Sequence, residues 1–170
     1  TTYTFTPNAG QCGGTTTMTV VVNPIVTPTF SAIAAICSGQ SLSPLPTVSN
    51  NSVSGTWAPA LNNTSTTTYT FTPSASQCAN TTTLTITVHP SVSVTLSTVS
   101  SICVGANSFS LPYTASAGSP STYTISGTGI TSVTNGVLTA SPITVNLSSP
   151  AVFGTNPSFT ISFKNTGGCS

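Results

Sequence analysis

The chain has 170 residues with a single Lys or Arg, one His and no Asp or Glu, so its formal net charge is +1. Without carboxylates it lacks the acid of a serine triad, both members of a glycosidase pair and the charged oxygens of a calcium cage. One Lys gives no electrostatic footprint for nucleic acid, and no apolar run is long enough to span a membrane. We therefore expect a protein that is not an enzyme, with no catalytic residue, cofactor, metal site, nucleic-acid partner or membrane span.

Ser and Thr dominate the composition, but Val, Ile, Phe and Tyr recur at alternate positions along many short runs. Thr suits a pleated strand because its Cβ is branched, and alternation with period 2 is the pattern of a strand with one buried face. A disordered chain would lack these apolar residues. The sequence predicts an all-β protein.

One stretch occurs twice. It reads TYTFTPNAGQCGGTTTMTVVVNP up to Pro24 and TYTFTPSASQCANTTTLTITVHP up to Pro90. Tyr3 and Tyr69 are 66 residues apart, as are Cys12 and Cys78. A fixed period of this size indicates tandem modules.

Residues 1–24 hold two predicted strands, one of which carries Tyr3 and Phe5 on the same face. Two strands are too few for a stable domain, so we interpret this segment as the C-terminal part of a truncated module. Residues 25–90 form a complete module that closes with the repeated stretch. Pro24 and Pro90 are the predicted boundaries, and the short junctions suggest a semi-rigid rod.

Residues 91–170 begin the unit again. Asn135-Gly136 predicts a type I′ hairpin turn, because both residues tolerate positive φ. Phe159, Ile161 and Phe163 predict the counterpart of the aromatic strand. No strand follows Cys169, so this module is expected to lack its last strand and to leave an edge that a strand from another copy could fill.

The five cysteines fall into two positions of the repeat. Cys37 and Cys103 are early cysteines, each after an Ile, whereas Cys12, Cys78 and Cys169 are late ones beyond an aromatic strand. We predict disulfides Cys37–Cys78 and Cys103–Cys169, and a partner for Cys12 outside this sequence. The alternative is that they are buried free thiols, which pack as small hydrophobic groups.

Four aromatic residues are predicted to lie in the core: Trp57, Tyr123, Tyr69 and Phe71. Trp57 lies 20 residues after Cys37, and Tyr123 lies 20 residues after Cys103. A Trp between two cysteines resembles the immunoglobulin sandwich, where it packs on the inter-sheet bridge. The alternative for Trp57 is sugar stacking. His89, before Pro90, is predicted to be an exposed linker residue.

The stretches IAAICSGQSLSPLPTVSNNSVSGTWAPALNNT and TTTYTFTPSASQCANTTTLTITVHP resemble the tandem Ig-like repeats of very large secreted surface proteins of the Bacteroidota. ICVGANSFSLPYTASAGSPSTYTISGTGI and SFTISFKNTGGCS resemble the PKD-like modules found beside them. The resemblance implies tandem Ig-like β-sandwich modules in adhesins or filaments exported by the type IX secretion system. It carries over no catalytic residue.

Three functions follow as hypotheses. The first is a structural spacer or stalk in a long extracellular adhesin or surface filament. The others are a module that binds glycans or proteins, and an accessory β-module of a secreted enzyme. The expected partners are neighbouring modules of the same chain, other copies through strand addition, and surface glycans. The expected location is extracellular, at the cell surface, because paired cysteines suit an oxidising compartment.

Overall fold

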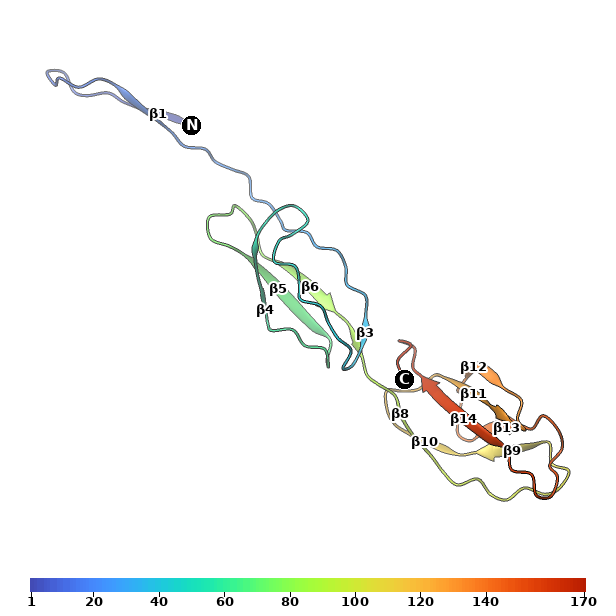
Figure 1. Cartoon of the computed structure of the whole chain (residues 1–170). Helices are drawn as coiled ribbons and strands as arrows, with labels where there is room; N and C mark the ends of the chain where they lie inside the picture. Colours follow the sequence, from blue (N-terminus) through green and yellow to red (C-terminus); the bar gives the residue numbers. More distant parts are fainter. The chain divides into compact units, whose positions relative to one another are not determined.

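The computed structural model describes residues 1–170, the whole chain. It is all-β, as predicted, with fourteen strands and no helix (Figure 1). The strands form six separate small sheets of two or three strands each, and none closes into a barrel. Alternating Thr and large apolar residues account for this, because such a strand buries one face and exposes the other.

By contacts, the chain divides into two compact units. The first comprises Thr1–Ala32, Leu45–Pro59 and Tyr69–Leu84, and the second comprises Ile33–Pro44, Ala60–Thr68 and Thr85–Ser170. These limits differ from the three segments expected from the repeat (1–24, 25–90 and 91–170), and that division stays a prediction.

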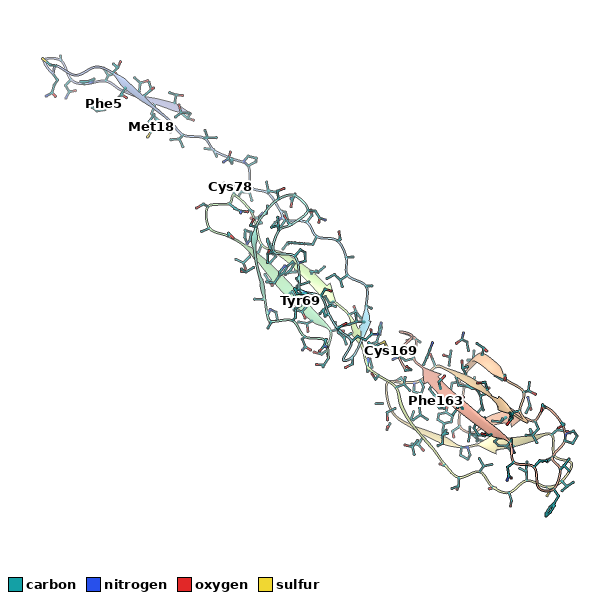
Figure 2. All side chains as sticks on the ribbon, in the orientation of Figure 1. Phe5, Met18, Tyr69, Cys78, Phe163 and Cys169 are labelled. Atoms are coloured by element: carbon teal, nitrogen blue, oxygen red, sulfur yellow. A yellow bond between two sulfur atoms is a disulfide. The ribbon has the colours of Figure 1, made fainter.

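The N-terminal strands form a two-stranded antiparallel hairpin, β1 (Thr2–Phe5) with β2 (Thr16–Thr19). Tyr3 lies opposite Met18, and Phe5 lies opposite Thr16. Every residue of both strands is exposed, including Phe5 and Met18, which Figure 2 labels. The apolar face of this hairpin is therefore unpartnered within the chain.

The second copy of the repeat lies in a three-stranded sheet of order β4-β5-β6, with β4 at Gly55–Ala58, β5 at Thr67–Pro73 and β6 at Thr82–Ile86. Tyr69 and Phe71 on β5 are fully buried, whereas the intervening Thr70 is exposed. On the polar face the Thr68 and Thr85 hydroxyls hydrogen-bond across 2.7 Å. The alternation predicted from the sequence is thus present residue by residue.

Phe71 belongs to an aromatic cluster in the first unit. Its ring centroid lies 5.1 Å from that of Trp57 on β4 and 4.8 Å from that of Phe30, and the Phe30 and Trp57 centroids are 4.7 Å apart. Tilted and edge-on arrangements at these distances are favourable for aromatic pairs. Residues 30, 57 and 71 are thereby held together although they are far apart in the sequence.

Two short strands pair in parallel in the second unit: β3 (Ile36–Cys37) and β7 (Val88–His89). The register places Ile36 opposite Val88 and Cys37 opposite His89. This pairing fixes the early cysteine beside the predicted boundary at Pro90.

Residues 93–164 contribute three further sheets. Their strands pair β10 with β8, β13 with β9, and β12-β11-β14 in that order. The strand bounds are β8 Ser93–Leu96, β9 Ser108–Leu111, β10 Tyr113–Ala117, β11 Thr122–Thr128, β12 Val133–Val137, β13 Ile143–Asn146 and β14 Ser158–Lys164.

A core cluster of buried apolar side chains forms between these sheets. Its members are Phe109, Leu111, Ile125, Ile130, Ile143, Val145 and Phe163. Pro112 separates β9 from β10 and lacks a backbone N–H, so the strand breaks there and the chain passes from one sheet to the other. The aromatic strand predicted at Phe159, Ile161 and Phe163 is confirmed as β14.

The hairpin turn predicted at Asn135-Gly136 is wrong. Both residues lie inside strand β12, which pairs with β11 through an irregular register between Tyr123 and Ile125. Asn135 does have a positive φ of 51°, but the backbone uses it for a bulge, and its N–H bonds the Thr124 hydroxyl. Gly136 lies opposite Tyr123, whose ring occupies the space that a Cβ would need.

Candidate functional site

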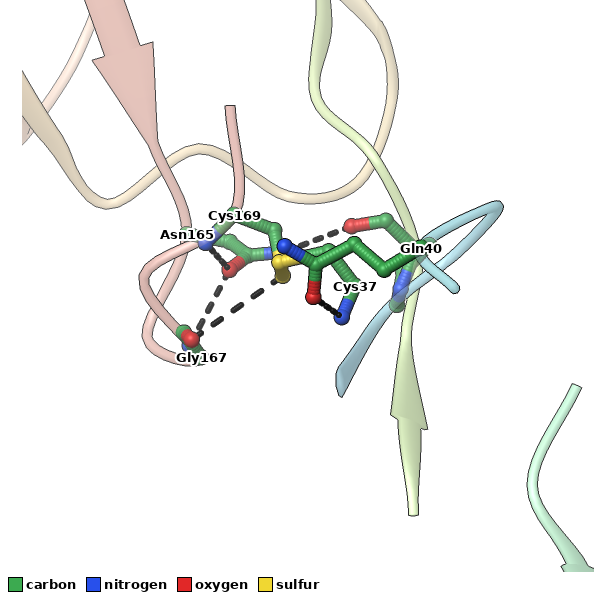
Figure 3. The surroundings of a disulfide bond; sticks show 6 residues. Cys37, Gln40, Asn165, Gly167 and Cys169 are labelled. Carbon is green, nitrogen blue, oxygen red and sulfur yellow. Dashed lines mark hydrogen bonds between the residues drawn. A yellow bond between two sulfur atoms is a disulfide. The ribbon is translucent and has the colours of Figure 1, made fainter. Parts of the chain in front are cut away.

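One disulfide links Cys37 on β3 with Cys169, which follows β14 (Figure 3). The two cysteines are 132 residues apart in the sequence, and their Cα atoms are 5.6 Å apart. Cys169 is almost completely buried, and Cys37 is half-buried. The bond joins the predicted segment 25–90 to the predicted segment 91–170, so it crosses the expected boundary at Pro90.

The Asn165 side chain organises the loop that carries Cys169. Its Oδ1 accepts hydrogen bonds from the Gly167 N–H and the Cys169 N–H, both at 3.0 Å. Its Nδ2 donates to the Pro90 carbonyl at 2.8 Å. Asn165 is buried, so these bonds satisfy a polar group that would otherwise be costly to bury.

On the other side of the disulfide, Gln40 holds the turn that follows Cys37. Its Oε1 accepts from the Cys37 N–H at 2.8 Å, and its own N–H donates to the Cys37 carbonyl at 3.0 Å. Gly39 has a φ of 85°, which only glycine adopts without strain at this position of the turn. Both cysteines therefore lie in backbone that local side chains hold in place.

His89 contacts both the turn that follows Cys37 and the loop that carries Cys169. It is a half-buried residue of β7, not the exposed linker residue that we expected. Its carbonyl accepts from the Ser38 N–H at 2.8 Å. A Cβ on Gly167 would overlap the His89 imidazole ring, so the glycine allows the loop of Cys169 to approach it. The absence of a side chain at Gly167 is thus a requirement of the contact.

The predicted disulfide Cys37–Cys78 is wrong, and Cys78 is a free, exposed cysteine. Cys37 lies opposite His89, and the extended segment from Thr82 to His89 separates that point from Cys78. A strand segment of this length spans about 20 Å, whereas a disulfide needs Cα atoms within about 7 Å.

The predicted disulfide Cys103–Cys169 is wrong for the same kind of reason. Ile102 and Val104, which flank Cys103, line a cavity with Phe159 at the start of β14. Cys169 lies beyond the other end of that strand, about 20 Å away along it. Cys103 is accordingly free and exposed, as is Cys12, whose expected partner lies outside the sequence.

The four predicted core aromatics differ in burial. Tyr69 and Phe71 are fully buried, whereas Trp57 and Tyr123 are half-buried. The Trp57 indole N–H donates to the Pro46 carbonyl at 2.9 Å, and its ring packs against Phe30 and Phe71. These contacts orient the Trp57 ring toward Phe30 and Phe71.

Sequence reasoning missed Asn165 and Gly167. The signal was present, because Asn165-Thr166-Gly167-Gly168-Cys169 and Asn8-Ala9-Gly10-Gln11-Cys12 both place an Asn four residues before a late cysteine. Such an Asn readily caps the backbone of a turn. What the sequence did not indicate was that the same side chain also reaches the Pro90 carbonyl.

No group of three or more His, Cys, Asp or Glu side chains is close enough together to hold a metal ion. No helix is present that is long and apolar enough to cross a membrane. The chemistry that the site offers is that of thiols and disulfides, combined with backbone hydrogen bonding.

No family model matches the chain, and neither a curated protein nor a solved structure matches it.

Proposed function

We propose that the chain is a non-catalytic structural repeat segment of a long extracellular adhesin or surface filament, in which it acts as a spacer or stalk. In this proposal its sheets belong to tandem Ig-like β-sandwich modules arranged as a rod. The resemblance to secreted surface proteins of the Bacteroidota is part of the same proposal.

The observation that supports it best is the junction around Cys37 and Cys169. A disulfide and the Asn165–Pro90 hydrogen bond both bridge the boundary that the repeat predicts. A spacer has to resist bending and separation of its modules, and a covalent bond across a junction provides that resistance. In the chain-entropy model, closing a loop of 132 residues stabilises the folded chain by about 5 kcal/mol.

The proposed extracellular location draws on the same bond. Structural disulfides persist in oxidising compartments, and glutathione and thioredoxin reduce them in the cytosol.

A chain with almost no charge also has little electrostatic repulsion between copies, which favours lateral association. Strand β14 lies at the edge of its sheet, where a strand from another copy could add.

Small-angle X-ray scattering tests the spacer proposal. A compact chain of 170 residues has a radius of gyration of about 15 Å. We expect the oxidised protein to have a clearly larger radius and the scattering profile of a rod. A radius of gyration close to the value of about 15 Å for a compact chain would overturn the proposal.

A glycan- or protein-binding module is the alternative. Glycan-array binding tests it with the wild-type chain and a Trp57→Ala variant. Because Trp57 packs against Phe30 and Phe71, we expect no glycan signal that depends on it. A specific signal that Trp57→Ala abolishes would favour the binding module over the spacer.

A further inference from the structure

An exposed apolar surface surrounds the free cysteine Cys103. Phe153 is 92% exposed, Val104 70% and Val152 61%. All three line a cavity of about 420 Å³, to which Phe109 and Phe159 also contribute. We call this surface the Cys103 face and define it as Ile102, Cys103, Val104, Ala151, Val152 and Phe153.

The turn at Cys103 has the same construction as the turn at Cys37. The Ala106 N–H donates to the Cys103 carbonyl at 3.1 Å, as the Gln40 N–H donates to the Cys37 carbonyl at 3.0 Å. Gly105 has a φ of 88° and Gly39 a φ of 85°.

Each of these glycines is also held from outside the turn. The Gly105 N–H donates to the Ala151 carbonyl at 2.8 Å, and the Gly39 N–H donates to the Asn63 carbonyl at 2.9 Å. One of the two equivalent early cysteines is bonded to a late cysteine, and the other is free. Two turns of the same construction therefore differ in that Cys37 is bonded and Cys103 is a free thiol.

The loops of the late cysteines are also alike. The residue before each cysteine donates its N–H to the carbonyl three residues earlier, at 2.9 Å for Gly168 to Asn165, 3.2 Å for Gln11 to Asn8 and 3.4 Å for Gln77 to Ser74. In sequence, the Cys12 loop is more similar to the Cys169 loop than the Cys78 loop is. Asn8 has the same amide side chain as Asn165, whereas Ser74 stands at that position before Cys78. In the bonded loop that amide reaches across to the Pro90 carbonyl.

The hairpin that carries Cys12 has its own unpartnered apolar side chains, Phe5 and Met18, which are 65% and 63% exposed. A contact between this hairpin and the Cys103 face would bury apolar surface on both sides. Neither side carries a charged side chain that would oppose the contact.

We propose that the Cys103 face is a docking site for the Cys12 hairpin of a second copy of this chain, and that Cys103 and Cys12 form a disulfide there. The link repeats between copies the early-to-late connection that Cys37 and Cys169 make within one copy. It concerns a contact between copies, and it stands or falls separately from the proposed spacer function.

The chemistry requires an oxidant, for which a low-molecular-weight disulfide such as oxidised glutathione serves. The Cys12 thiolate attacks one sulfur of the oxidant, forming a mixed disulfide and releasing one reduced glutathione. The Cys103 thiolate then attacks the Cys12 sulfur, which forms the Cys103–Cys12 bond and releases the second reduced glutathione. The two protein thiols lose two electrons and two protons, and one oxidant molecule takes them up.

The experiment incubates the purified chain with oxidised glutathione and follows dimers on a non-reducing gel, with peptide mapping of the linked cysteines. We expect dimers and larger head-to-tail chains linked through Cys103 and Cys12. Cys103→Ser and Cys12→Ser should each abolish these species, whereas Cys78→Ser, which removes the third exposed thiol, should not change them. Circular dichroism and an intact Cys37–Cys169 bond show that each variant is folded.

A second pair of variants tests the apolar contact. Phe153→Ser removes an aromatic side chain from the Cys103 face and should slow the formation of the link about tenfold, which corresponds to burying part of one such side chain. Val137→Ser removes a similarly exposed apolar residue on β12, outside the Cys103 face, and should leave the rate unchanged.

Several outcomes would overturn the proposal. These are a chain that stays monomeric, a link between Cys12 and Cys103 of the same chain, dimers linked through Cys78 or through two Cys103 residues, and an indiscriminate mixture of all three thiols. Equal rates for Phe153→Ser and Val137→Ser would show that the apolar surface plays no part.

Discussion

The Asn165 side chain donates a hydrogen bond to the Pro90 carbonyl at 2.8 Å, although 75 residues separate the two in the sequence. The same side chain accepts two backbone N–H groups of its own loop, so one amide both shapes the loop of Cys169 and attaches it to the predicted module boundary.

Replacing Asn165 by Ala removes all three hydrogen bonds and leaves the Pro90 carbonyl without this donor. We expect a loss of about 2–3 kcal/mol in the free energy of unfolding, because each bond is worth about 1 kcal/mol. Urea denaturation followed by circular dichroism measures it. The matched control is Asn146→Ala, on the exposed face of β13, for which we expect a change of at most about 0.5 kcal/mol. Equal effects of the two substitutions would contradict the role given to Asn165.

Replacing Gly167 by Ala puts a methyl group into the space of the His89 ring. We expect a destabilisation of about 1–3 kcal/mol from this overlap. The double variant Gly167→Ala/His89→Ala should recover much of the loss, because the ring that causes the overlap is gone. Gly14→Ala is the control, since nothing lies near its added Cβ. Without recovery in the double variant, the overlap with His89 is not the cause.

Alkylation with iodoacetamide, without prior reduction, should modify Cys12, Cys78 and Cys103 and spare Cys37 and Cys169. The reason is that only the last two are bonded, while the other three are exposed thiols. Intact mass and peptide mapping give the result. A peptide linking Cys37 to Cys78 would refute the assignment.

The double variant Cys37→Ala/Cys169→Ala should lose about 4–5 kcal/mol of stability, because its unfolded state is no longer restricted by the loop. Cys103→Ala serves as the control and should change stability little.

Trp57 allows the hydrogen bond and the ring packing to be separated. Trp57→Phe removes the indole N–H that donates to the Pro46 carbonyl but keeps an aromatic ring, so we expect a loss of about 1 kcal/mol. Trp57→Ala also removes the contacts with Phe30 and Phe71 and should cost about 3 kcal/mol. Urea denaturation of both variants gives the two values. A Trp57→Ala variant as stable as the wild type would show that the aromatic cluster contributes nothing.

Local features of the fold followed from the sequence. Alternation of Thr with Tyr69 and Phe71 predicted a strand with one buried face, and β5 has that face. Phe159, Ile161 and Phe163 predicted β14 in the same way. These predictions hold because the period of a strand is a property of neighbouring residues and does not depend on the rest of the chain.

At Asn135-Gly136 the local sequence does not determine the structure, because both residues lie inside β12 and not in a hairpin turn. The pair supplies the positive φ of a hairpin turn, but a β-bulge uses the same conformation. Two contacts favour the bulge over the turn. The Tyr123 ring covers Gly136, and the Thr124 hydroxyl accepts the Asn135 N–H. Both residues lie on the partner strand β11.

By itself, the sequence determined the all-β class, the strand-forming runs and the two positions that cysteines take in the repeat. Only the tertiary structure decided which cysteines meet. The repeat suggested pairs within a predicted module, but an extended strand keeps its two ends about 20 Å apart. The early and late cysteines of one predicted module lie toward opposite ends of such strands. A bond can form only where Cα atoms approach to about 7 Å, and the β3–β7 register, Asn165 and Gly167 together bring Cys37 that close to Cys169.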